Sequence, residues 1–129
     1  MPIDTLTTWH RLAASSDAAG LDELLADDVV FHSPIVHTPQ VGKAITALYL
    51  SAAFRVFNNE TFRYVREVKG QTDAVLEFIT VINGITVNGV DMIRWNEAGQ
   101  ITDFKVMVRP LKAIQLIHEQ MGAMLKTLG

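Results

Sequence analysis

The sequence predicts a single α+β domain in which helices pack against a curved antiparallel or mixed sheet and leave an apolar pocket between them. Apolar residues recur at helical spacing in the first third of the chain and again near its end. Between them, residues 60–109 alternate apolar and polar positions in runs separated by turn residues. The 129 residues, 49% of them hydrophobic, suffice for one core, and no repeat or linker divides residues 1–129 into further domains.

The charge and the cysteine count exclude several functional classes. The net charge is −3 and no Lys/Arg cluster occurs, so nucleic acids and anionic membranes are poor candidate partners. The absence of cysteine excludes disulfides, thiolate metal sites and a cysteine nucleophile. No apolar run approaches the roughly 18 residues of a membrane span, and the polar residues within Met1 to Leu12 argue against a signal peptide. We expect a cytoplasmic protein.

Two helices are expected at the N-terminus. Asp4 or Thr5 can cap the first, because each can accept a hydrogen bond from a free amide of the first turn. Its apolar positions are Leu6, Trp9, Leu12 and Ala13. After Gly20 a short second helix covers Leu21 to Leu25. A short strand, Val29 to Phe31, should follow.

A loop and a third helix come next. The loop, Ser33 to Gly42, contains two prolines, of which Pro34 stops the preceding strand. The third helix runs from about Lys43 to Phe57. Its apolar residues form two stripes with few polar residues between them, so we expect it to be buried on two sides.

Four further segments complete the expected fold. Three long strands are expected at Glu60 to Lys69, Ala74 to Ile82 and Ile85 to Trp95. A fourth strand, Ile101 to Arg109, follows a turn and pairs with the third. Asn83-Gly84 is a strong signal for a tight hairpin between the second and third of these strands. Pro110 can open a final helix with an apolar stripe along it.

The turns decide which residues face each other across the sheet. A two-residue turn at Ala98-Gly99 pairs Val106 with Asp91, and the turn at Asn83-Gly84 pairs Leu76 with Asp91. Because Leu76 and Val106 belong to inward-facing sets, Asp91 should face inward between them. A competing turn at Asn88-Gly89 would change this pairing. The Asn83 turn leaves strands of matched length, with Gly89 as a bulge or a point of close approach.

The same register places Arg94 opposite Asp103, which predicts a weak ion pair on the outer face. On the inner face, loss of water should raise the pKa of Asp91. A neutral carboxyl group can donate a hydrogen bond to a substrate oxygen, and perturbed acids often mark functional sites. The alternative is that a Trp, Tyr or backbone donor satisfies Asp91 and that it does nothing else.

Two runs resemble a known family. The run Leu25 to Pro34 resembles the helix-to-strand junction of the NTF2-like superfamily, and Val90 to Ile101 resembles its late hairpin. Over Thr5 to Arg109 the chain looks closest to SnoaL-like proteins and ketosteroid isomerases. The resemblance implies an NTF2-like cone, a bent sheet closed by N-terminal helices, and often a homodimer through the outer face of the sheet.

The resemblance also assigns expected positions. Ketosteroid isomerases use a general-base Asp with an oxyanion hole made of a Tyr and a protonated Asp. Asp91 falls where the protonated acid sits, Trp9 where the Tyr sits and Ser33 where the base sits. A serine hydroxyl is no base near neutral pH without activation, so steroid isomerisation by that mechanism is not expected. SnoaL-like cyclases also use an inward acid. The helix after Pro110 departs from the isomerase pattern and is expected to cover the sheet or the pocket mouth.

The candidate site follows from these placements. Asp91 is the expected catalytic acid, and His37, in the proline-bounded loop, is a possible acid/base partner if that loop rims the pocket. His32 should point to the outer face. The expected substrate-binding wall consists of Trp9, Phe31, Ser33, Tyr49, Leu76, Phe78, Ile93, Trp95, Phe104 and Val106. For the aromatic members, plain core packing is the alternative.

No cofactor or metal is implied, because no nucleotide-binding motif and no metal-ligand spacing occurs in the sequence. The expected partner is a small hydrophobic molecule. One hypothesis is an isomerase, cyclase or dehydratase acting on a hydrophobic carbonyl compound. A second is a ligand-binding protein without turnover, and a third is an interaction protein whose dimer surface matters. A homodimer also fits the outer face, where Met92 and Met107 lie among charged residues.

Overall fold

The structure is a computed structural model that describes residues 3–128. Its helices are α1 (Thr5–Ser15), the 3-10 turn η1 (Ala18–Gly20), α2 (Leu21–Leu24), α3 (Lys43–Phe57) and α4 (Leu111–Leu128). Its strands are β1 (Leu25–His32), β2 (Gln40–Val41), β3 (Arg63–Lys69), β4 (Asp73–Ile82), β5 (Ile85–Trp95) and β6 (Ile101–Arg109). None of these helices has the length and hydropathy that crossing a membrane requires.

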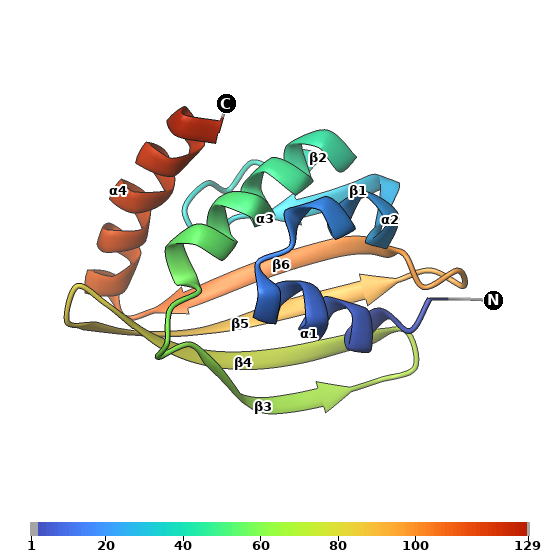
Figure 1. Cartoon of the computed structure of the whole chain (residues 1–129), viewed down its shortest axis with the longest axis horizontal. Coiled ribbons are helices and arrows are strands. Elements are labelled where there is room, and N and C mark those ends of the chain that lie inside the picture. The colour runs from blue at the N-terminus through green and yellow to red at the C-terminus, as the bar shows by residue number, and fades with distance from the viewer. Residues whose placement is uncertain (1–2, 129) are drawn as a thin grey trace.

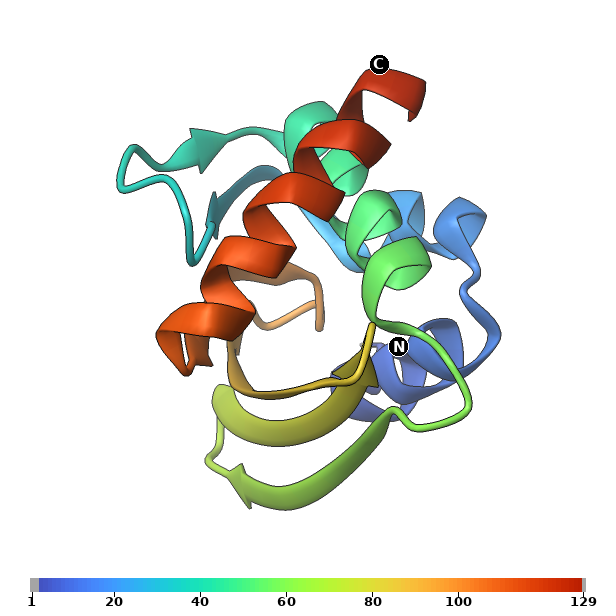
Figure 2. The ribbon, with the colours of Figure 1, turned by 90° about the vertical axis from the view of Figure 1, so that its left-hand side faces the viewer.

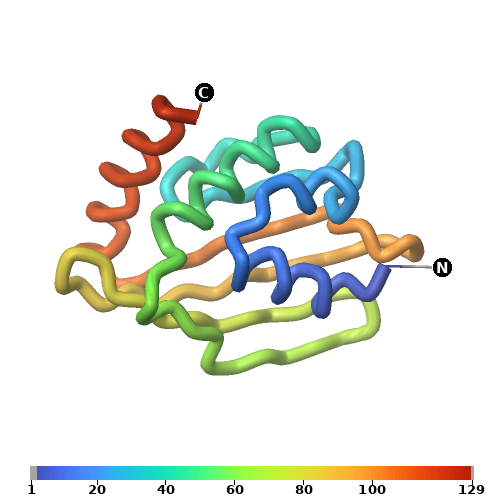
Figure 3. The backbone as a smooth tube through the Cα atoms, in the orientation of Figure 1, coloured from blue at the N-terminus to red at the C-terminus, as the bar shows by residue number. Residues whose placement is uncertain are grey.

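The strands form one curved, open, mixed sheet in the order β2-β1-β6-β5-β4-β3. Only β1 and β6 run parallel, and the other neighbours are antiparallel. Figure 1 shows α1, α2 and α3 on one face of the sheet, with α4 rising from one end. The tube in Figure 3 and the end view in Figure 2 show how β3, β4 and β5 bend beneath the helices. The predicted α+β cone is confirmed.

The predicted register of the central strands is confirmed. Leu76 lies opposite Asp91 across β4 and β5, and Asp91 lies opposite Val106 across β5 and β6. Asn83 and Gly84 both have positive φ, 50° and 75°, as a primed hairpin turn requires. The turn at Asn83-Gly84 therefore fixes which face of β5 carries Asp91.

The turn between β5 and β6 differs from the expected two-residue turn. Five residues, 96–100, connect the strands, and Asn96 Oδ1 accepts from the amides of Ala98 and Gln100, both at 3.0 Å. An irregularity just beyond Arg94 restores the register, so Arg94 still faces Asp103. The expected ion pair between these two residues does not form, because Arg94 points to Asp73, 3.9 Å away between Nη2 and Oδ2. Asp103 instead bonds His32 on the outer face.

Two strands begin three or more residues away from their predicted starts. The first strand begins at Leu25 and not at Val29, because the exposed Asp27-Asp28 pair is accommodated within it at an irregularity in the β1–β6 pairing. The third strand, β3, begins at Arg63, because Asn59 Oδ1 accepts from the Thr61 amide at 2.8 Å and holds the preceding residues in a turn. At α1, Asp4 is the cap and accepts from the Thr7 amide at 3.2 Å.

The core consists of two clusters of buried side chains. The α1–α2 cluster, next to those helices, includes Leu6, Leu12, Leu24, Leu76, Ile93 and Ile101. The α4 cluster, at the other end of the sheet, includes Val56, Phe57, Phe78, Val87, Leu116 and Ile117. Tyr64 and Val106, both half-buried, pack against both clusters. The hydrophobic core is therefore divided along the length of the sheet.

Gly89 lies under the ring of Phe78, its partner across β4 and β5. It pairs regularly on both sides, so it is a point of close approach without a bulge. A Cβ atom there would lie 2.8 Å from Phe78 Cε2 and 2.9 Å from the Met107 carbonyl oxygen. The Phe78 ring therefore requires glycine at this position.

We expect Gly89→Ala to lower the free energy of unfolding by about 1–3 kcal/mol, because the Phe78 ring and the backbone of β6 must shift to admit the methyl group. Urea denaturation measures the change. Gly122→Ala is the matched control, since a Cβ at Gly122 in α4 meets nothing within 4 Å. Equal stability of the two variants would contradict the close approach at Gly89.

Candidate functional site

A cavity of about 120 Å³ lies between the two core clusters. The α1–α2 cluster contributes Trp9, Phe31, Phe54 and Phe104 to its wall, and the α4 cluster contributes Phe57, Phe78 and Ile117. Aromatic rings and aliphatic side chains therefore form most of this wall. Such a lining favours an apolar molecule.

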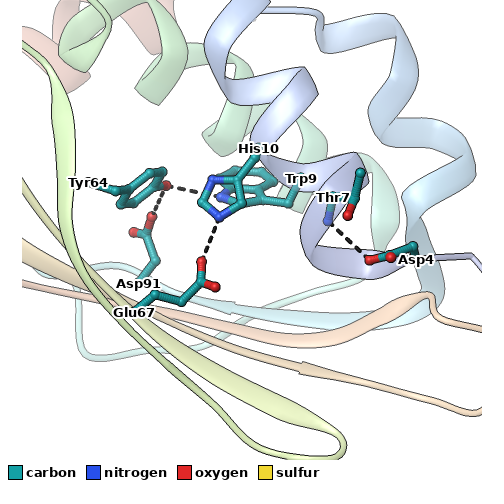
Figure 4. Close-up of polar contacts among 7 residues, drawn as sticks. All are labelled: Asp4, Thr7, Trp9, His10, Tyr64, Glu67 and Asp91. Atoms are coloured by element: carbon teal, nitrogen blue, oxygen red, sulfur yellow. Dashed lines mark hydrogen bonds and ion pairs between the residues drawn. The ribbon is translucent and has the colours of Figure 1, made fainter.

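Asp91 is the carboxyl group in this wall, and its residue is 6% exposed. The Tyr64 hydroxyl donates to Asp91 Oδ2 at 2.6 Å, and the Trp9 indole N–H donates to the Tyr64 oxygen at 3.0 Å. Figure 4 shows the Tyr64 hydroxyl joined to both Asp91 and Trp9, which brings together α1, β3 and β5. Asp91 Oδ1 accepts no hydrogen bond from residues 3–128, and the Asp91 side chain lines the cavity. This oxygen is available to a ligand in the cavity.

Burial governs the protonation of this pair. Loss of water raises the pKa of Asp91 from 3.8 to about 7, although the hydrogen bond from Tyr64 opposes the rise. Loss of water and the nearby Asp91 charge raise the pKa of Tyr64 well above 10. Tyr64 therefore stays a neutral donor, while Asp91 exchanges its proton near neutral pH.

A second polar pair lies beside this network but outside the cavity wall. His10 Nε2 is 2.7 Å from Glu67 Oε1, and both side chains are well exposed. The His10 ring meets the Tyr64 ring edge to face, with centroids 5.2 Å apart. Figure 4 shows His10 in front of Trp9, with Glu67 below it and close to Asp91. The pair packs against the ring of Tyr64 and leaves the hydroxyl to Asp91.

Most of the predicted wall does line the cavity. These residues are Trp9, Phe31, Ser33, Tyr49, Phe78, Phe104 and Val106, together with Asp91. Ser33 Oγ accepts from the Ile35 amide at 3.0 Å, so it organises the loop after β1. The Tyr49 ring packs on Phe31 with centroids 5.3 Å apart, and its hydroxyl bonds no residue within 3–128. Their roles in binding stay predictions.

Four predicted site residues lie elsewhere. Leu76 and Ile93 face inward but are sealed in the α1–α2 cluster, because α1 and α2 cover that end of the sheet. Trp95 packs against the same cluster at the end of β5. His37 is exposed and borders a separate surface recess with Lys105, because the loop after β1 turns only Ser33 to Val36 toward the cavity.

The sequence missed the donor to Asp91 and one side of the cavity. Tyr64 lies on β3, an edge strand whose other residues are exposed, so no alternation marks its inward face. Its cross-strand partner Phe78 is the signal that could have found it, since Phe78 was expected to face inward. Many of the other missed residues come from α3 and α4 and include Phe54, Phe57, Met121, Gly122 and Leu125, whereas Pro34, Ile35 and Val36 come from the loop after β1.

Within residues 3–128, no cluster of three or more histidine and acidic side chains is arranged to hold a metal ion. Asp91 combines a raised pKa with an oxygen that accepts no hydrogen bond within residues 3–128, and its surroundings are aromatic and aliphatic. This arrangement can bind one polar atom of a mostly apolar molecule. It can also give a proton to that atom or take one from it.

A curved sheet with helices over a cavity on its concave face defines a protein of the NTF2-like, cystatin-like cone fold. A family model described as a SnoaL-like domain matches residues 6–104. The chain belongs to the SnoaL-like family of the NTF2-like superfamily, as its sequence predicted. No curated protein gave a significant match.

Solved structures agree with this assignment. A steroid delta-isomerase from Pseudomonas aeruginosa is 38% identical, over 95% of this chain and 90% of that chain, with a TM-score of 0.90. An uncharacterized protein with a cystatin-like fold from Silicibacter pomeroyi DSS-3 is 32% identical, over 93% and 84% of the two chains, with a TM-score of 0.86. A de novo designed protein with a curved β-sheet shares the fold alone, at 12% identity over 89% and 94% and a TM-score of 0.71.

The raised pKa of Asp91 predicts how stability depends on pH. Folded protein keeps the Asp91 proton up to about pH 7, whereas the unfolded chain releases it near 3.8. The folded state therefore binds more protons in this window, and the free energy of unfolding falls as pH rises through it. The fall is on the order of 4 kcal/mol, and it levels off above the folded pKa.

We expect Asp91→Asn to remove this pH-dependent fall in the free energy of unfolding. The variant should therefore become more stable relative to wild type as pH rises from about 4 to about 7. Urea denaturation at several pH values measures the difference. Asp103→Asn, at a part-exposed acid on the outer face of β6, is the matched control. Wild-type and Asp91→Asn curves that run parallel with pH would show that Asp91 titrates normally.

Proposed function

We propose that this chain binds a small, mostly apolar carbonyl compound in the cavity and performs acid/base chemistry on it with Asp91. The observation that carries the proposal is a buried carboxyl group with one oxygen held by Tyr64 and the other free, in a wall of aromatic rings. A ligand oxygen placed against the free oxygen would be the partner that Asp91 lacks. The rest of the ligand would then contact only apolar surface.

The chemistry proposed is of the isomerase, cyclase or dehydratase type. A carboxyl group with a pKa of about 7 is present in both forms near neutral pH, so it can accept a proton at one carbon and return it at another. Between these two steps Asp91 is neutral and the substrate carries the negative charge as an enolate. The neutral Tyr64 hydroxyl would stabilise the Asp91 carboxylate before the first transfer and after the second. The 38% identity to a steroid delta-isomerase supports this class of reaction.

Ligand binding without turnover is the second candidate. It is favoured by the state of Ser33, which stands where the resemblance to ketosteroid isomerases places the base. Its oxygen accepts from the backbone amides of Ile35 and Val36, at 3.0 and 3.4 Å. His37, the other expected acid/base group, does not reach the cavity. If the protein were an enzyme, Asp91 alone would have to carry out every proton transfer.

The test uses a β,γ-unsaturated steroid ketone and a small non-steroid β,γ-unsaturated ketone. Formation of the conjugated enone is followed by ultraviolet absorbance, and binding is followed by calorimetry. We expect wild-type turnover to fall by about 10²- to 10⁴-fold in Asp91→Asn, because the general acid/base is lost. Binding should weaken far less, since the amide still offers a hydrogen bond.

Asp103→Asn again serves as the control and should match wild type in turnover and binding. Binding without turnover in the wild type would favour the second candidate. An Asp91→Asn variant with wild-type turnover would reject Asp91 as the acid/base group. Failure of both ketones to bind would contradict the proposed function altogether.

We also propose that the chain forms a homodimer through the outer face of the sheet. Met92 and Met107 there are 38% and 51% exposed, and Val68 on β3 is 59% exposed. Val75 joins Val68 to Met92, because it pairs with both across β4. Burying such a face against a second copy removes apolar surface from water. A cytoplasmic location stays a prediction from the sequence.

The double variant Met92→Glu with Met107→Glu is expected to shift the protein to monomers, because pairing two copies would bury four new charges. Sedimentation equilibrium measures the change. The control is Val41→Glu on β2, a residue that is 69% exposed on a strand at the far edge of the sheet. A monomeric wild type would refute the dimer and leave the cavity proposal untouched.

A further inference from the structure

Gly122 lies in the interior of α4 and forms part of the cavity wall. His118, Met121 and Leu125 also line the cavity and lie on the same face of the helix, because residues three and four apart are neighbours there. Met121 and Leu125 are half-buried, whereas His118 is exposed. The cavity therefore extends from the buried Asp91 to a helix face that reaches solvent.

The glycine at position 122 has no structural explanation in the packing of the helix. Glycine weakens a helix interior, so it is usually found there where a neighbour approaches closely or where φ must be positive. Gly122 has a helical backbone without positive φ. A Cβ atom on it would meet nothing within 4 Å. The missing side chain thus leaves open space beside α4.

The open space beside Gly122 lies at the mouth of the cavity. Pro34, Ile35 and Val36, in the loop after β1, line the cavity, and so do residues at the C-terminal end of α3. Figure 2 views this end of the molecule and shows α4 crossing it diagonally, beside α3. Val36 is 42% exposed, so this side of the cavity also reaches the surface.

We propose that Gly122 keeps open a passage along α4 through which the apolar tail of an elongated ligand leaves the cavity. The ligand's oxygen would lie at Asp91, and its chain would run past Met121 and Leu125. This inference deepens the proposed function and rests on it. The ligand would then be too large to fit wholly inside the cavity of about 120 Å³. Gly122 would set the length of tail that can bind.

Straight-chain methyl ketones from 2-pentanone to 2-undecanone are the probes, since they vary the tail and keep the carbonyl group. Their dissociation constants are measured by NMR, following the indole N–H signal of Trp9, which lies in the cavity wall. For wild type we expect about a four-fold gain in affinity for each added methylene that is buried. The gain should continue past the length that fills the cavity.

Gly122→Leu should stop this gain at a shorter ketone, because its side chain fills the passage. The longest ketone should bind it at least about ten-fold more weakly than wild type, and 2-pentanone should bind both equally. Gly122→Ala should change the series little, since its methyl group has room. Ala123→Leu adds the same side chain at an exposed neighbouring position and should behave as wild type.

The results distinguish a failure of the proposed passage from a failure of the proposed function. If the ketones bind wild type and Gly122→Leu gives the same dependence on chain length, the passage is refuted and the proposed function stands. If Gly122→Leu weakens 2-pentanone as much as 2-undecanone, Gly122 shapes the inner cavity and the passage is again refuted. If no ketone binds wild type, both the passage and the proposed function fail.

Discussion

The hydrogen bond from Tyr64 to Asp91 is the interaction on which the cavity depends. A carboxyl group among aromatic and aliphatic side chains loses much of its hydration, and within residues 3–128 Tyr64 is its one side-chain donor. Trp9 fixes that donor from the opposite layer, so the network ties α1 to β3 and β5. The two core clusters meet here without merging, and Tyr64 and Val106 contact both of them.

Much of this arrangement was predictable because it depends on contacts close in sequence. The Asn83-Gly84 turn sets the pairing of β4 with β5, and the alternation along β5 then places Asp91 on the concave face. The span of α3 follows equally from its own residues, and the structure has it from Lys43 to Phe57 as expected. Where one strong turn or one helical stripe decides the geometry, the sequence is sufficient to predict the structure.

The rest of the site depends on contacts between segments far apart in the chain. Tyr64 reaches Asp91 only because β3 is added to the edge of the sheet, and the exposed residues of β3 carry no inward pattern. Leu76 and Ile93 were expected in the wall because they share a face with Asp91. Their neighbours in space, α1 and α2, seal them into the core instead. Alternation along a strand assigns a face, but it does not say which helix covers that face.

The wall of the cavity is divided between two kinds of element. Asp91 sits on β5, which has long strands on both sides, whereas α4 packs mainly against α3 at the periphery. Substitutions on α4 therefore meet fewer constraints than substitutions on the central strands. Descendants of this chain could acquire new ligand preferences by changing α4 while inheriting the acidic group unaltered. Selection could diversify what the protein recognises without first rebuilding how it handles a proton.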